Sequence, residues 1–114
     1  MIEQRRAKRF ELELPLEIVR AGSEKVSETG TTRNISSGGV LFLTARELEV
    51  GGPVEYVVTL ASGNTGVVNL RCMGKVLRAD RLVSEEELQQ RGSNFEIAAT
   101  LERYEFVRDR GAAS

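Results

Sequence analysis

A strict alternation of apolar and polar residues, starting at residue 10, constrains the fold of this chain more than any other feature. Apolar side chains occupy every second position: Phe10, Leu12, Leu14, Leu16 and Ile18. A helix would scatter these side chains around its axis, whereas a strand places all of them on one buried face. We therefore predict a strand here. Pro15 cannot donate to a ladder, so we expect an edge, or a loosely closed barrel, at that point.

Further alternating segments follow, separated by glycine-rich turns. The polar stretch around Val26 indicates an exposed second strand, and residues 40–43 form a short apolar strand. Residues 54–60 and 67–78 alternate on either side of a turn at 62–66, which is typical of a hairpin, and residues 94–97 suggest a last strand. Cys72 lies on the core phase of its strand, so we interpret it as a small buried apolar residue.

Two segments favour helices. Ser84 to Glu87 resembles a capping box, with Gly92 as a plausible stop. Residues 100–110 are rich in helix formers, with Leu101, Tyr104 and Val107 or Arg108 on one stripe. The predicted fold is thus mainly β: a small six-stranded antiparallel β-barrel, with a C-terminal α-helix covering its opening.

Composition narrows the class of function. The 114 residues are enough for one domain. With a net charge of -1, the molecule as a whole does not attract a polyanion strongly, so any such attraction must come from local clusters of positive charge. The chain has no histidine, one cysteine and no metal-ligand spacing, so we expect no enzyme, metal or cofactor. The N-terminus lacks an apolar leader and no run could span a bilayer, which predicts a cytoplasmic protein without membrane insertion.

The densest positive charge is the run Arg5-Arg6-Ala7-Lys8-Arg9. In an extended chain Arg5 and Arg9 share one side, and guanidinium groups can grip a phosphate through paired hydrogen bonds and stack on a base. The alternative is a solvated tail without a fixed partner. We expect residues 1–9 to form a flexible arginine arm, and residues 10–114 to form the folded domain.

A second polar motif, residues 32–39, reads Thr-Arg-Asn-Ile-Ser-Ser-Gly-Gly and directly precedes the apolar strand. Asn and Ser shape turns by bonding to nearby backbone, and glycine lets a ligand or another backbone come close. By itself the motif is also explained by a tight turn that needs no ligand.

Together the two motifs resemble the PilZ domain, the bacterial receptor module for cyclic diguanylate (cyclic di-GMP). That family couples an N-terminal R-x-x-x-R, here Arg5 to Arg9, with a later D/N-x-S-x-x-G, here Asn34 to Gly39. A late Gly-x-x-Phe, here Gly92 to Phe95, and a terminal helix occur at similar places in the family. The resemblance covers nearly the whole chain and implies binding of cyclic di-GMP.

The ligand carries two phosphodiesters and two guanines, which suit arginine. The guanidinium fork matches the O6 and N7 edge of guanine, and its plane stacks on the ring. The resemblance implies that Arg5 and Arg9 carry these contacts. Arg6 would be a secondary contact or a solvated charge.

The resemblance also assigns roles to the second motif. Asn34 would offer an acceptor to the N–H edge of guanine, Ser36 a hydroxyl, and Gly39 bare backbone open to close approach. Gly38 also belongs to the expected ligand-binding residues. The family has Asp or Asn at the first of these places. An anionic acceptor bonds more strongly, so Asn34 predicts somewhat weaker guanine binding than Asp would give.

As partners we expect cyclic di-GMP, an unidentified downstream protein and no nucleic acid, with the chain a monomer or weak homodimer. Single-stranded nucleic acid would need exposed aromatic platforms, whereas Phe10, Phe42, Tyr56 and Phe95 fall on apparent core phases. The alternative function is a PilZ-like domain that binds protein and no nucleotide, using the strand edge near Pro15 or the C-terminal helix.

Overall fold

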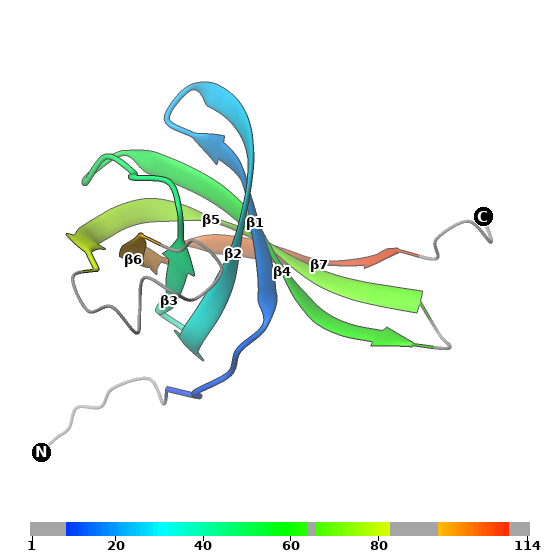
Figure 1. Ribbon diagram of the computed structural model, residues 1–114. Coiled ribbons are helices and arrows are strands. Elements are labelled where there is room, and N and C mark those ends of the chain that lie inside the picture. Colours follow the sequence, from blue (N-terminus) through cyan, green and yellow to red (C-terminus); the bar gives the residue numbers. More distant parts are fainter. Residues whose placement is uncertain (1–8, 64–65, 83–93, 110–114) are drawn as a thin grey trace, which may run out of the picture.

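The computed structural model describes residues 9–63, 66–82 and 94–109, which form a seven-stranded antiparallel sheet (Figure 1). Its strands are β1 (Pro15–Ala21), β2 (Glu24–Ser36), β3 (Gly39–Thr44), β4 (Pro53–Gly63), β5 (Gly66–Arg81), β6 (Phe95–Thr100) and β7 (Arg103–Asp109). The order is β4-β1-β2-β3-β6-β5-β7, and β4 also pairs with β5, so the pairings of six strands form a closed series. The mainly β, antiparallel prediction is confirmed, with seven strands rather than six.

Strand β5 is sixteen residues long and uses both of its edges. One edge pairs with β4 along residues 66–75. The other pairs with β7 along residues 67–73 and with β6 along residues 76–81. Only Leu101 and Glu102 separate β6 from β7, so these two strands lie end to end along β5. Among the described strands β7 pairs only with β5, so it is an edge strand.

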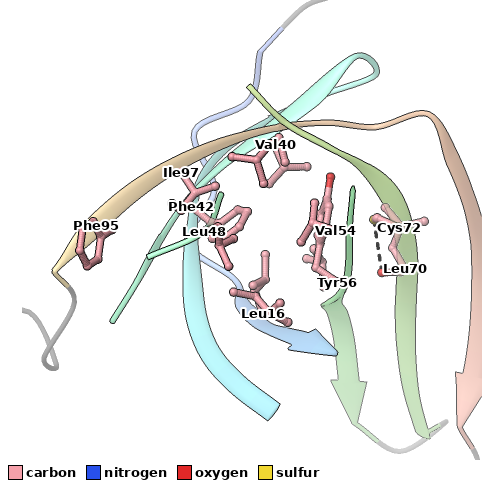
Figure 2. Packing of buried hydrophobic residues seen from close by; sticks show 14 residues of the cluster. Leu16, Val40, Phe42, Leu48, Val54, Tyr56, Leu70, Cys72, Phe95 and Ile97 are labelled. Carbon is pink, nitrogen blue, oxygen red and sulfur yellow. Dashed lines mark hydrogen bonds between the residues drawn. The ribbon is translucent and has the colours of Figure 1, made fainter. Parts of the chain in front are cut away.

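The core lies on one face of the strands, where alternating side chains meet (Figure 2). Phe42 and Tyr56 pack with ring centroids 5.7 Å apart, and the Tyr56 hydroxyl donates to the Thr100 carbonyl at 3.0 Å. Burial raises the pKa of the Cys72 thiol to about 12. Burial is also the main reason why the pKa of the Tyr56 hydroxyl is raised, and the nearby Cys72 adds a smaller effect in the same direction. Both side chains are therefore neutral core groups near pH 7, as predicted for Cys72.

The first alternating segment is only partly a buried strand. Leu16 and Ile18 are buried, but Phe10 and Leu12 are 54% and 44% exposed, so the prediction of one continuous buried face is wrong. The reason is that β4 pairs with β1 only from Leu16 onward. Leu14 still packs against the core, whereas Phe10 and Leu12 lie beyond it.

Strand β1 as a whole is internal, because it lies between β2 and β4. At Pro15 itself it pairs with β2 alone, which agrees with the predicted edge or loose closure at that point. Pro15 is the first residue of β1 and pairs with Thr31 of β2, outside the β1–β4 register. Because the ladder between β1 and β4 begins only after Pro15, the missing N–H group of this proline interrupts no hydrogen bond to β4. This explains how an internal strand accommodates a proline.

The predicted C-terminal helix over residues 100–110 is wrong as well, because residues 103–109 form β7. The exposed edge of β5 offers these residues a full row of backbone partners, from Met73 opposite Arg103 to Val67 opposite Asp109. Tyr, Phe and Val also suit a strand. Tertiary pairing thus outweighs the helical propensity of the neighbouring charged residues.

The other predictions for individual elements have mixed outcomes. The hairpin of β4 and β5 and the strand beginning at Phe95 are confirmed. The helix predicted from Ser84 to Gly92 lies outside the described residues. No helix in the described part of the chain is long and apolar enough to cross a bilayer.

Residues 9–14 precede β1 and continue along the edge of β2. Phe10 exchanges two backbone hydrogen bonds with Ile35, at N···O distances of 2.8 and 2.9 Å. Thr32 is fully buried, and its hydroxyl accepts from the Leu14 amide at 2.9 Å and donates to the Leu12 carbonyl. The Thr32 amide donates to the Leu14 carbonyl at 2.9 Å. One side chain on β2 therefore ties down the N-terminal segment.

Replacing Thr32 by valine should loosen this segment. Thr32→Val keeps the shape but leaves the Leu14 amide and the Leu12 carbonyl without the hydroxyl, so we expect a loss of about 1–3 kcal/mol in the free energy of unfolding. Urea denaturation measures the loss, and amide exchange at Leu14 should accelerate. Thr32→Ser retains the hydroxyl and serves as the control. Equal exchange in both variants would contradict this role.

Gly74 should be irreplaceable because the β5 and β6 backbones meet there. A Cβ on Gly74 would lie 2.0 Å from the Thr100 carbonyl oxygen, so something in the backbone must shift. We expect Gly74→Ala to lower the free energy of unfolding by about 1–3 kcal/mol or more. Gly38→Ala is the matched control, since a Cβ there meets nothing within 4 Å. Equal stability of the two variants would refute the close approach.

Candidate functional site

The second polar motif forms the end of β2, the turn at Ser37 and Gly38, and the start of β3. The buried Ser36 hydroxyl accepts from the Gly38 amide at 3.2 Å and donates to the Gly39 carbonyl at 3.3 Å. A serine hydroxyl bonded to backbone two residues on is a local turn device. The tight turn is therefore present, and Ser36 holds its shape.

Asn34 sits beside a bulge in β2. Thr32 pairs with Phe42 and Asn34 with Leu41, so the intervening Arg33 is the extra residue in the ladder between β2 and β3. Bulges bend a strand and re-aim the side chains next to them. Arg33 is exposed and forms an ion pair with Glu96 of β6 at 3.2 Å, whereas Asn34 is half-buried.

Arg9 meets Asn34 even though 25 positions separate them in the sequence. The Arg9 guanidinium donates through Nη1 to Oδ1 of Asn34. The backbone explains this contact. Because Phe10 pairs with Ile35 of β2, Arg9, which directly precedes Phe10, lies beside the end of β2 that carries Asn34. Arg9 is exposed, so its charge remains accessible from solvent.

The two glycines of the turn have different surroundings. A Cβ on Gly39 would lie 2.8 Å from the Ala99 carbonyl oxygen, so glycine is required there by the approach of β6. A Cβ on Gly38 would meet nothing within 4 Å, and Gly38 is exposed. The backbone predicted to be open at Gly39 is therefore approached by the protein itself, and the open backbone of the motif lies one residue earlier, at Gly38.

The structure thus gathers most of the predicted site into one place, which we call the motif corner: Arg9, Asn34, Ser36, Gly38 and Gly39. Arg5 and Arg6 lie outside the described residues. The sequence analysis missed Thr32, whose buried hydroxyl holds the segment that carries Arg9. The sequence did contain a signal for this role, because Thr32 alternates with Asn34 and Ser36 as a polar residue of the same motif.

The chemistry that the motif corner offers is recognition by charge and hydrogen bonds. It has one permanent cation at Arg9, an amide at Asn34 that both donates and accepts, and exposed backbone at Gly38. Within residues 9–63, 66–82 and 94–109, no group of histidine, cysteine, aspartate or glutamate side chains is placed to hold a metal. Such a corner suits an anionic ligand that also carries a hydrogen-bonding edge.

A comparison with solved structures supports the fold. The structure of the Bacillus subtilis inhibitor of motility (MotI/DgrA) superposes with a TM-score of 0.64 at 15% sequence identity. The match covers 91% of this chain and 45% of that chain, so the present sequence spans less than half of that protein's length. At this identity the likeness shows a shared fold.

The sequence comparisons place the chain in a family. No curated protein sequence matches it significantly. The model of the PilZ domain matches residues 3–104, which include both polar motifs and every described strand up to the start of β7. The chain therefore belongs to the PilZ domain family.

Proposed function

We propose that this PilZ domain is a cyclic di-GMP receptor and that the nucleotide binds at the motif corner. The observation that carries the proposal is the hydrogen bond from Arg9 to Asn34, because it unites the two family motifs at the surface of a folded domain. Without it, each motif would have an adequate local explanation as a tail or as a turn.

Arg9 has donors to spare for the ligand. One N–H group of its guanidinium donates to Asn34, and within the described part of the chain the rest of the group makes no hydrogen bond or ion pair. Those N–H groups suit a phosphodiester oxygen, or the O6 and N7 edge of guanine. Asn34 thereby orients the fork in advance, which lowers the entropy lost when the nucleotide binds.

The remaining residues of the motif corner have supporting roles in this proposal. Asn34 keeps an amide NH₂ group and a second lone pair on its oxygen, which suit the N–H and carbonyl edges of guanine. Ser36 is already engaged in the turn, so it acts mainly by holding the backbone of Gly38 in place. The exposed Gly38 lets the ligand approach that backbone closely.

We further propose that residues 1–9 act as an arm carrying Arg5 and Arg6 toward the same ligand. Mutual repulsion among these cations disfavours a closed arm, and the ligand phosphates would neutralise it. Binding would then change the surface that a downstream protein meets.

Several finer features belong to the same proposal. The closed series of strand pairings supports the proposal that the domain is a small barrel, as expected for the family. The module acts by binding rather than catalysis, and a single buried thiol fits a reducing, cytoplasmic compartment. The alternative, a protein-binding domain without a nucleotide, is favoured by one observation: the exposed aromatic side chains of β7.

Calorimetric titration with cyclic di-GMP tests the proposal. The wild-type chain should bind, and Arg9→Ala should lose at least ~100-fold in affinity, since a charge-assisted contact is worth about 1.5–3 kcal/mol and Arg9 would make more than one to the nucleotide. Its melting temperature without ligand should stay nearly unchanged because Arg9 is exposed.

The matched control is Arg46→Ala, which removes an arginine paired with Glu24 at the other end of β2. This variant should bind as the wild type does. An unchanged affinity in Arg9→Ala, or no binding by the wild-type chain, would refute the proposal. A large drop in melting temperature would instead assign Arg9 a structural role.

Hydrogen exchange tests the arm separately. At saturating cyclic di-GMP, the amides of residues 4–8 should gain protection, whereas the Phe10 amide, already bonded to Ile35, should change little. Binding without added protection of residues 4–8 would show that the motif corner takes the nucleotide without help from the arm.

A further inference from the structure

Strand β7 carries two large aromatic side chains in solvent. Tyr104 and Phe106 are 59% and 66% exposed, and their rings lie edge to face with centroids 6.1 Å apart. Strand β7, which carries them, lies on the part of the sheet where β4, β5 and β7 project from the other strands (Figure 1). Neighbouring exposed aromatics on one strand mark an interaction surface more often than isolated ones do.

These aromatics continue the rows of the buried core. Phe106 lies opposite Leu70 of β5, which lies opposite Val58 of β4. Tyr104 extends the neighbouring row in the same way, beyond Cys72. Since directly opposed residues share one face of a sheet, the core face extends onto β7, where its side chains Tyr104 and Phe106 are exposed.

The backbone of β7 is also available. Among the described strands it pairs only with β5, so its outer edge presents N–H and C=O groups that another strand could use. No proline or bulge interrupts its register with β5 from Arg103 to Asp109. An even, uninterrupted edge of this kind favours the addition of a strand.

We propose that the occupant is β7 of a second copy of this chain, paired antiparallel about a twofold axis through Phe106. With a twofold axis normal to the sheet at Phe106, a residue a given number of positions before Phe106 in one copy faces the residue the same number of positions after Phe106 in the other copy. Phe106 then faces its own copy and Tyr104 faces Arg108, an aromatic–cation pair that occurs twice. Arg103 comes into register with position 109, an aspartate in the sequence.

Charge selects this register over its neighbours. Centring the pair on Glu105 would set two glutamates opposite each other, and centring it on Val107 would set Glu105 opposite the aspartate at 109. Like charges directly opposite destabilise a strand pair. The register through Phe106 uses all seven residues of β7 and opposes no like charges. This dimer does not require nucleotide binding, so it can be tested without the ligand.

A cysteine at the axis tests the register directly. In Phe106→Cys the new thiols of two copies would face each other within the Cα separation of about 7 Å that a disulfide allows. Mild oxidation should therefore cross-link most of the protein, and Cys72 cannot contribute because it is fully buried. In the matched control Arg103→Cys, the two thiols would lie about 20 Å apart along the strands and should not cross-link.

Sedimentation equilibrium of the full chain without nucleotide supplies the second readout. The wild type should show a concentration-dependent dimer, and Phe106→Glu, which sets two carboxylates opposite each other, should raise the dissociation constant at least ~10-fold. Since Phe106 is mostly exposed, that variant should keep its fold by circular dichroism. A monomer at every concentration, a dimer unaffected by Phe106→Glu, or equal cross-linking of both cysteine variants would overturn the proposal.

Discussion

Backbone pairing along both edges of β5 is the interaction on which the remaining structure depends. This sixteen-residue strand pairs with β4 on one side and with β6 and β7 on the other. It therefore connects β4, at one end of the strand order of the sheet, with β6 and β7 at the other end. Gly74 lies where this strand passes close to the end of β6, and its missing side chain permits the approach to Thr100. The Thr100 carbonyl there also accepts from Tyr56, which links the crossing to the core.

The same kind of pairing, on a smaller scale, assembles the motif corner. The segment before β1 has no strand of its own, yet Phe10 and Leu14 bond to β2, and the buried Thr32 hydroxyl satisfies groups that would otherwise lack partners. Arg9 reaches Asn34 as a consequence. A recognition site of two short motifs is therefore built by backbone geometry, while the side chains that face solvent remain available for a ligand.

Sequence reasoning succeeded where burial follows the period of the strand and failed where it does not. Val54, Tyr56, Val58, Leu70 and Cys72 are buried as their alternation predicts. Phe10 and Leu12 continue an equally regular alternation but are exposed, because they precede the residues at which β4 pairs with β1. The alternation in the sequence does not reveal where that pairing begins. Residues 103–109 have mixed propensities, and the free edge of β5 made them a strand.

The sequence by itself determined that the chain is mainly β and antiparallel, which side chains of the central strands are buried, and that it carries both PilZ motifs, since these depend on local spacing. Only the tertiary structure decided that Arg9 contacts Asn34, that Thr32 holds the N-terminal segment, and that β7 is an edge strand with exposed aromatics. The physical reason is that each of these depends on hydrogen bonds between segments distant in sequence, and local residue patterns do not encode which backbone edges will meet.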